Sequence, residues 1–236
     1  MIISFDGTAY HGWQKQKNAI SVQQIIEQKL EILIGKKTET LGCGRTDTGV
    51  HARKFVLHFE TIKKPSKNFL YNLNSILPQD IAVLKISHVN SSFNARFSAK
   101  KREYRYFIHF EKNPFLINKS TLLNKNPDFD KLNKACEILK KYNDFASFSK
   151  KGSDNKTTIC KIYEAKWVKK NKQYIFIIIA DRFLRNMVRA ITGTMLDIGY
   201  GKINIDDFVK IIESKDRKNS STSAPPGGLY LWDIKY

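Results

Sequence analysis

Apolar positions in the first hundred residues repeat with two different periods, and each period predicts a different kind of element. Between 22 and 33 they recur at the three- and four-residue spacing of a helix face. The residues on this face are Val22, Ile25, Ile26, Leu30 and Leu33. Ser21 and Gln24 have the spacing of a capping box, and Gly35 follows as a residue that commonly ends helices. The pattern therefore predicts a helix from Ser21 to Gly35.

Shorter apolar runs, some with a two-residue period, predict the strands of this first half. The predicted strands are 1–5, 38–43, 55–59 and 81–87. The first of them is followed by a turn at Asp6-Gly7. A second helix is predicted from about 67 to 77, because Pro78 disfavours helical backbone at the residue before it.

The second half repeats this mixture of strands and helices. Its predicted strands are 102–110, 159–168, 174–180 and 229–234, the middle two forming a hairpin. Its predicted helices begin at Asp128, span 183–198, and span 205–212. A polar linker at 215–223 and a turn at 225–228 precede the last strand.

These elements indicate an α+β protein with two halves. The order strand–helix–strand–strand–helix–strand in the first half is typical of a ferredoxin-like or RNA-recognition-like unit. The motif order places the boundary near Ser98, so we expect an N-terminal half at 1–98 and a C-terminal half at 99–236.

The charge of the chain indicates which class of partner the protein binds. Among 236 residues, Lys and Arg number 41 and acidic residues 22, which gives a formal net charge of +19. A surface so basic attracts polyanions, with nucleic acid as the first candidate and an anionic membrane surface as the second. A genome biased toward Lys, Asn and Ile codons is the alternative explanation.

Other compositional features narrow the chemistry. The three cysteines, Cys43, Cys136 and Cys160, include no C-x-x-C pair, which indicates a reducing compartment rather than a disulfide framework. The histidines do not cluster with them, so no metal site is predicted. The longest apolar run, 174–180, is too short to span a bilayer, and no signal peptide is evident. We expect a soluble, cytoplasmic protein.

One loop, 44–49, carries a carboxylate in a setting that suits catalysis. Glycines at 42, 44 and 49 bracket Arg45-Thr46-Asp47 and let backbone approach a bulky ligand closely. A neighbouring guanidinium holds a carboxylate ionised, as nucleophilic or general-base chemistry at a sugar requires. A structural turn with a local Asp–Arg pair explains the same residues. A phosphate-binding P-loop does not, because Gly-Lys-Ser/Thr is missing.

Two further stretches combine features of RNA binding with features of an ordinary core. In 93–110, basic residues including Arg102 alternate with Tyr104 and Tyr106, which suits stacking of unpaired bases beside phosphates. The alternative is a plain strand with these tyrosines buried. In 181–193 a helical period places three arginines on one stripe, which is either a solvated face or a phosphate-binding one. These are Arg182, Arg185 and Arg189.

Together these stretches resemble one family, the TruA-type tRNA pseudouridine synthases. Seven blocks occur in the family's order and cover nearly the whole chain. They are FDGTAYHGWQ (5–14), SVQ (21–23), GRTDTGVHA (44–52), LNSILPQDIAV (73–83), SFNARFSAKKREYRY (92–106), FLRNMVRAITG (183–193) and SAPPGGLYLWDIKY (223–236). Departures from the family pattern are Phe5 for a usual Tyr, Thr48 for a usual Ala, and Lys54-Phe55 for a common Gly-Gln pair.

The resemblance implies roles for individual residues. Asp47 aligns with the family's catalytic Asp and Arg45 with the Arg of the same signature. Tyr104 aligns with the Tyr that packs against the target base. Arg189 aligns with the Arg that faces the Asp across the cleft. Whether Asp47 attacks the sugar, attacks the ring or removes a sugar proton stays open.

The resemblance also implies the fold, the reaction and the partners. The pseudouridine synthase fold joins two ferredoxin-like halves in a mixed, mostly antiparallel sheet, flanked by helices, with a central basic cleft. The reaction is an isomerisation of uridine in the anticodon stem-loop of tRNA, at positions 38–40, and it needs no cofactor or metal. The family also implies a homodimer.

Two other functions remain as alternatives. A non-catalytic RNA-binding protein on the same scaffold would share the charge and the aromatic residues, but it would not need Asp47. A DNA-binding protein is disfavoured, since no helix-turn-helix or zinc-finger spacing is present.

Overall fold

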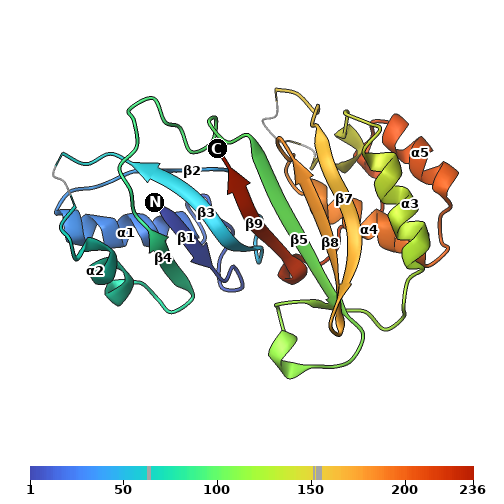
Figure 1. The fold of residues 1–236 in the computed structure, drawn as a ribbon, viewed down its shortest axis with the longest axis horizontal. Coiled ribbons are helices and arrows are strands. Elements are labelled where there is room, and N and C mark those ends of the chain that lie inside the picture. Colours follow the sequence, from blue (N-terminus) through green and yellow to red (C-terminus); the bar gives the residue numbers. More distant parts are fainter. Residues whose placement is uncertain (63–64, 151, 153–155) are drawn as a thin grey trace. The chain divides into compact units, whose positions relative to one another are not determined.

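The computed structural model describes residues 1–62, 65–150, 152 and 156–236. The chain divides into two compact units (Figure 1). Unit 1 consists of Met1–Lys100 together with Tyr230–Tyr236, and unit 2 of Lys101–Leu229. The last seven residues therefore belong with the first hundred.

Unit 1 is a sheet with two helices. Its strands are β1 (Ile2–Phe5), β2 (Thr40–Gly42), β3 (His51–Phe59), β4 (Ile81–Lys85) and most of β9 (Leu229–Lys235). Its helices are α1 (Val22–Ile34) and α2 (Phe69–Ile76). The strand order is β4-β1-β3-β9, and β2 also pairs with β3. Of these pairs, β3–β9 is parallel and the others are antiparallel.

The core of unit 1 combines buried residues of α1 with aromatic side chains of the sheet and the loop before the helix. Phe55 on β3 lies 5.7 Å from Phe5 and 4.2 Å from Trp13, ring centre to ring centre. The helix begins after Ser21, whose hydroxyl accepts the Gln24 N–H at 3.3 Å, and ends at Gly35 with φ 74°. The predicted start and end of this helix are confirmed.

Unit 2 has a second sheet and three helices. Its strands are β5 (Lys101–His109), β6 (Thr121–Leu122), β7 (Ile162–Lys170) and β8 (Gln173–Ala180). Its helices are α3 (Phe129–Leu139), α4 (Met187–Gly199) and α5 (Ile205–Glu213). Short 3₁₀ turns lie at η1 (Pro114–Leu116), η2 (Ala146–Phe148), η3 (Arg217–Asn219) and η4 (Pro226–Gly228). Strand β8 lies between β5 and β7, antiparallel to both, and β6 runs parallel to β5.

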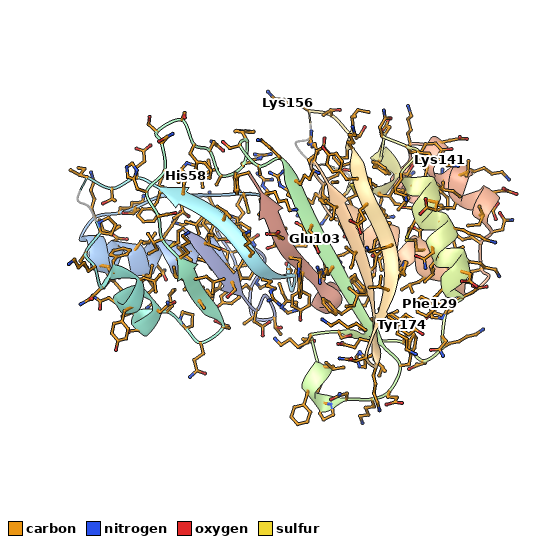
Figure 2. All side chains as sticks on the ribbon, in the orientation of Figure 1. His58, Glu103, Phe129, Lys141, Lys156 and Tyr174 are labelled. Carbon is orange, nitrogen blue, oxygen red and sulfur yellow. The ribbon has the colours of Figure 1, made fainter. Side chains whose placement is uncertain are left out.

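Helices α3 and α4 close the core of unit 2. Phe129 at the start of α3 stacks on Tyr174 of β8 at 3.8 Å between ring centres, and both are marked in Figure 2. Helix α4 is buried along almost its whole length, with Arg189 and Asp197 as its two residues that are not buried. Arg189 is thus held on one of the most rigidly packed elements of the unit.

The fourth helix starts later than the sequence pattern predicts. The predicted helix 183–198 begins at Met187, because Asn186 adopts the left-handed conformation with φ 65°. A left-handed residue cannot continue a right-handed helix, and Asn is one of the few side chains that tolerate it. The predicted stripe of three arginines on one helix face is therefore wrong. Arg182 and Arg185 lie in a loop, and only Arg189 lies on the helix.

The expected α+β class, with a mixed and mostly antiparallel arrangement of strands, is confirmed. In the part of the chain that the structure describes, no helix is both long and apolar enough to cross a membrane.

Candidate active site

The loop that carries Asp47 connects β2 to β3 in unit 1. Its first residue, Cys43, donates its N–H to the carbonyl of Val56 at 2.8 Å, which ties the loop to the sheet. Near its end, the Val50 N–H donates to the Asp47 carbonyl at 3.1 Å, and Gly49 takes a φ of 75°. Asp47 is half-buried at this tight turn. Its backbone is therefore fixed from both ends of the loop.

A second loop, residues 7–16, braces the first through its backbone. The Trp13 N–H donates to the Thr46 carbonyl at 3.4 Å, and the Gly49 N–H donates to the Tyr10 carbonyl at 3.2 Å. Gly12 lies between these two contacts with φ 81°. A Cβ atom at Gly12 would lie 2.2 Å from the Thr46 carbonyl oxygen, so only glycine fits here. This contact reaches the residue directly before Asp47.

The far end of the Asp47 loop is held by Asp6 and Gly7, which follow β1, and by Tyr230 of β9. A Cβ atom at Gly7 would lie 2.1 Å from the Val50 carbonyl oxygen, so the two backbones touch. The Gly7 N–H donates to Nδ1 of His51 at 3.0 Å, and a carboxylate oxygen of Asp6 lies 2.9 Å from the same nitrogen. The buried His51 ring stacks on Tyr230 at 4.5 Å. Segments from both ends of the chain thus converge on one loop.

The side chains within the loop differ in exposure. Arg45 is exposed, whereas Thr46 is buried with 8% of its surface accessible. Among the described residues, the Thr46 hydroxyl has no hydrogen-bond partner. The predicted pairing of Arg45 with Asp47 stays a prediction.

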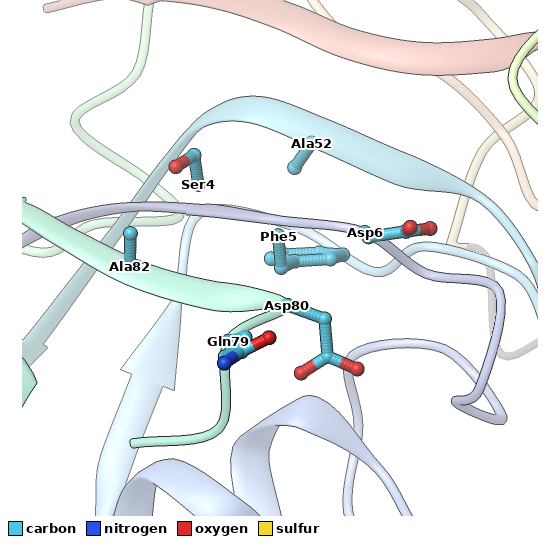
Figure 3. A pocket seen from close by; sticks show the side chains of 7 residues that line it. All are labelled: Ser4, Phe5, Asp6, Ala52, Gln79, Asp80 and Ala82. Atoms are coloured by element: carbon cyan, nitrogen blue, oxygen red, sulfur yellow. The ribbon is translucent and has the colours of Figure 1, made fainter. Parts of the chain in front are cut away.

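A cavity of about 380 Å³ opens on the β1–β3–β4 part of unit 1 (Figure 3). It is lined by Ser4, Phe5, Asp6, Ala52, Gln79, Asp80 and Ala82. Two carboxylates in its wall repel phosphate groups. Asp80 also accepts a hydrogen bond from the Tyr10 hydroxyl at 2.7 Å. Because Asp47 is not part of its lining, we do not assign the chemistry to this cavity.

Tyr104 lies on β5 of unit 2 and packs against the loop before α4. It is buried, with 9% of its surface accessible, and its ring meets Phe183 edge-to-face at 5.0 Å and 84°. Two residues earlier on the strand, Arg102 donates from Nη1 to the Asp181 carbonyl at 2.7 Å. The strand and the loop 181–186 therefore hold each other in place.

The three predicted arginines of this region take different positions. Arg189 donates from Nε to the Ala224 carbonyl at 2.8 Å, and its own carbonyl accepts the Ala224 N–H at 2.9 Å. Arg182 is half-buried, and its N–H donates to the Asp181 carboxylate at 2.7 Å. Arg185 is exposed, and its carbonyl accepts the Lys150 N–H at 3.0 Å.

Two of the cysteines are poor candidates for a nucleophile. Burial raises the pKa of Cys136 to about 12 and that of Cys160 to about 12, so both thiols stay protonated near neutral pH. All three cysteines are buried and unpaired with one another. The prediction of Asp47 as the reactive group of its loop stays a prediction.

The structure brings forward two residues that the sequence analysis did not single out, Gly12 and Asp181. Their signal is geometric: a close backbone approach at Gly12 and a set of hydrogen bonds at Asp181. Gly12 lies in the motif block 5–14, and Asp181 is the first residue of the stretch 181–193. Nothing in residue type alone distinguished them from their neighbours.

Comparison with known proteins gives one consistent result. The model of the family described as tRNA pseudouridine synthase matches residues 1–98 and 136–236. A tRNA pseudouridine synthase A of Bacteroides fragilis is 46% identical over 99% of this chain and 94% of its own length. That of Porphyromonas gingivalis is 41% identical over 99% and 95%, and that of Acetivibrio thermocellus 40% identical over 100% and 98%. The similarity thus extends over both units.

Proposed function

The chain belongs to the tRNA pseudouridine synthase family, and on this premise we propose that it converts uridine to pseudouridine at positions 38–40 in the anticodon stem-loop of tRNA. The enzyme is an isomerase. The observation that carries the assignment of the catalytic residue is the Asp47 loop, which strand β3 and the loop 7–16 brace through backbone contacts. Such bracing is the preorganisation that a catalytic carboxylate requires.

The reaction fits a site built from side chains alone. The bond between N1 of uracil and C1′ of ribose breaks, the base turns, and a bond between C5 and C1′ forms. The proton on C5 leaves and N1 gains a proton, so atoms and electrons balance without a redox partner. The target base must first leave its stack, at a cost of a few kcal/mol.

We assign Asp47 the role of the reacting carboxylate, acting at the sugar or the base. Tyr104 packs against the uracil and helps to remove the C5 proton, either directly or by positioning the group that does so. We assign Arg45 and Arg189 to binding of the RNA substrate at the site. Arg189 suits this role because its helix and its bonds to Ala224 fix its position.

We assign the contacts with the tRNA backbone to the remaining arginines. Arg102 lies at the start of β5, and Arg182 and Arg185 lie in the loop before α4. Arginine binds phosphate through two parallel N–H bonds. The net charge of +19 adds a long-range attraction for RNA.

The decisive experiment follows tritium release from tRNA labelled at carbon five of uridine. Wild type releases tritium, whereas Asp47→Asn binds tRNA with unchanged affinity and releases none. Asp233→Asn is the matched control, because Asp233 is a partly exposed carboxylate of the same unit, paired with Lys54 at 2.6 Å. Release by Asp47→Asn at the wild-type rate would remove Asp47 from its role. Binding without release by wild type would favour the non-catalytic RNA-binding function.

The target positions and the assembly are tested separately. Replacing uridines 38, 39 and 40 one at a time by cytidine identifies which of them contribute tritium. We also propose that the enzyme is a homodimer in the cytoplasm. Light scattering at assay concentrations distinguishes a dimer from a monomer, and localisation of a tagged full-length chain tests the compartment.

A further inference from the structure

Asp181 makes more polar contacts than any neighbouring residue of the loop that follows β8. Its carboxylate Oδ1 accepts two main-chain N–H groups, from Lys161 at 2.8 Å and from Arg182 at 2.7 Å. Its own N–H donates to the Lys161 carbonyl at 3.1 Å, and its carbonyl accepts Nη1 of Arg102 at 2.7 Å. One residue thus joins the start of the loop to two separate segments of unit 2.

These contacts fix the direction in which the loop leaves the sheet. The paired bonds with Lys161 hold the main chain of Asp181 from both sides. Its carbonyl therefore points in one direction, and the Arg102 guanidinium that binds this carbonyl is held with it. The other end of the loop is tied by a bond from the Asn186 amide to the Ser223 hydroxyl at 2.7 Å.

Between these two ends the loop supports Tyr104. Phe183 lies two residues after Asp181 and meets the Tyr104 ring edge-to-face at 5.0 Å. Edge-to-face contacts restrain both distance and tilt, so a shift of Phe183 changes the orientation of the tyrosine. Arg102, on the same strand as Tyr104 and two residues before it, is bonded to Asp181 as well. The tyrosine is therefore restrained through two separate connections to one residue.

We propose that Asp181 is a positioning residue, which holds the Tyr104 ring against the target uracil by fixing Phe183 and Arg102. This inference rests on the proposed function, since it gives a task to a residue of that same site. The role requires an oxygen acceptor at the position of Oδ1. It does not require a negative charge, because both groups that Oδ1 accepts are main-chain N–H groups. Asp181→Asn therefore keeps this positioning role, whereas Asp181→Ala loses it.

The first test is kinetic. Single-turnover tritium release is measured with enzyme in excess over a labelled anticodon stem-loop RNA, and each rate is normalised to the folded fraction. Asp181→Ala lowers this rate by about tenfold to a hundredfold, because misplacement of a catalytic group by about 1 Å has that effect. Affinity for the RNA changes less than threefold, and Asp181→Asn restores the rate to within threefold of wild type.

A matched control separates positioning from general destabilisation. Asp128 at the start of α3 also accepts two main-chain N–H groups, from Asp130 at 3.0 Å and Lys131 at 3.1 Å. Asp128→Ala removes the same kind of contact and leaves the normalised rate unchanged. A double-mutant cycle adds Phe183→Leu. In the Phe183→Leu background, Asp181→Ala has little further effect on the normalised rate, because the contact between Phe183 and Tyr104 is already lost.

A structural measurement makes the inference independent of turnover. In protein with ring-labelled tyrosine, the Tyr104 resonances are assigned by Tyr104→Phe. They shift in Asp181→Ala and stay in place in Asp128→Ala. Unmoved Tyr104 resonances, or a normalised Asp181→Ala rate within threefold of wild type, overturn the proposal. Absence of release by wild type with a shifted Tyr104 signal would instead count against the proposed function.

Discussion

Gly12 offers a test of how tightly the Asp47 loop must be held. In Gly12→Ala the new Cβ would lie 2.2 Å from the Thr46 carbonyl oxygen, whereas real Cβ contacts essentially never fall below 3.0 Å. The two loops must therefore move apart by about 1 Å, directly beside Asp47. A displacement of that size at a catalytic group costs about a hundredfold in rate. The left-handed backbone at φ 81° adds a stability loss of roughly 1–2 kcal/mol.

The chain supplies a control that isolates the clash from the backbone strain. Gly35 has nearly the same backbone conformation, with φ 74°, and a Cβ atom there would have no neighbour within 4 Å. Gly35→Ala thus shares the strain and lacks the contact with Thr46. Both variants should lose stability through the backbone strain, Gly12→Ala more so because of the added clash, while only Gly12→Ala should lose activity.

The assay is tritium release under saturating and subsaturating tRNA, with thermal unfolding measured on the same samples. We expect kcat for Gly12→Ala to fall by about a hundredfold and KM to change little, because RNA contacts outside the loop are intact. The reasoning is refuted if Gly12→Ala turns over within threefold of Gly35→Ala. It is also refuted if KM rises while kcat is kept.

Three further outcomes follow from the structure. Tyr106→Phe removes a hydroxyl that donates to the Pro225 carbonyl at 2.8 Å and lies 2.6 Å from the Thr121 hydroxyl, so calorimetry should show a loss of about 1–3 kcal/mol. Burial lowers the pKa of His58, whose Nδ1 accepts the Ala95 N–H at 3.1 Å. The contribution of neutral His58 to the free energy of unfolding is complete above about pH 6.5 and is lost as the pH falls below that value. His58→Gln should therefore flatten the decline of Tm between about pH 7.5 and 5.5. Finally, tRNA affinity should fall steeply with salt, and Arg185→Ala should reduce the slope of log K against log salt by roughly 0.7–0.9. An unchanged slope would remove Arg185 from the phosphate contacts.

Local features of the fold were predictable wherever the residues that determine them are close together in the sequence. The first helix is an example, since Ser21 and Gly35 act on backbone groups within four residues of themselves. The pairing of β7 with β8 was predictable for the same reason, because a short polar turn joins them. In the candidate site, residue type and motif coincide at Asp47 and single it out in the sequence, and its catalytic role stays a prediction.

Other features depend on single torsion angles or on distant partners. Phe183 and Leu184 continue the apolar period of α4, so only the left-handed Asn186 reveals that the helix starts after them. The parallel pairing of β3 with β9 joins His51 to Tyr230, far apart in the chain. No local pattern encodes such a pairing, because its stabilisation comes from contacts made only in the folded unit. Gly12 and Asp181 were missed for this reason as well.

The position of β9 in unit 1 has a consequence for biosynthesis. Unit 2 is complete when Leu229 has been made, whereas unit 1 must wait for Tyr230–Tyr236 although it is begun first. Those late residues supply the ring that stacks on His51 and a hydroxyl, on Tyr236, that donates to the Ala95 carbonyl at 2.7 Å. A nascent chain therefore carries Asp47 long before the strand beside it exists. A chain that stops before Tyr230 lacks the strand that pairs with His51 and Ala52, so we expect the segment that follows Asp47 to lose this support.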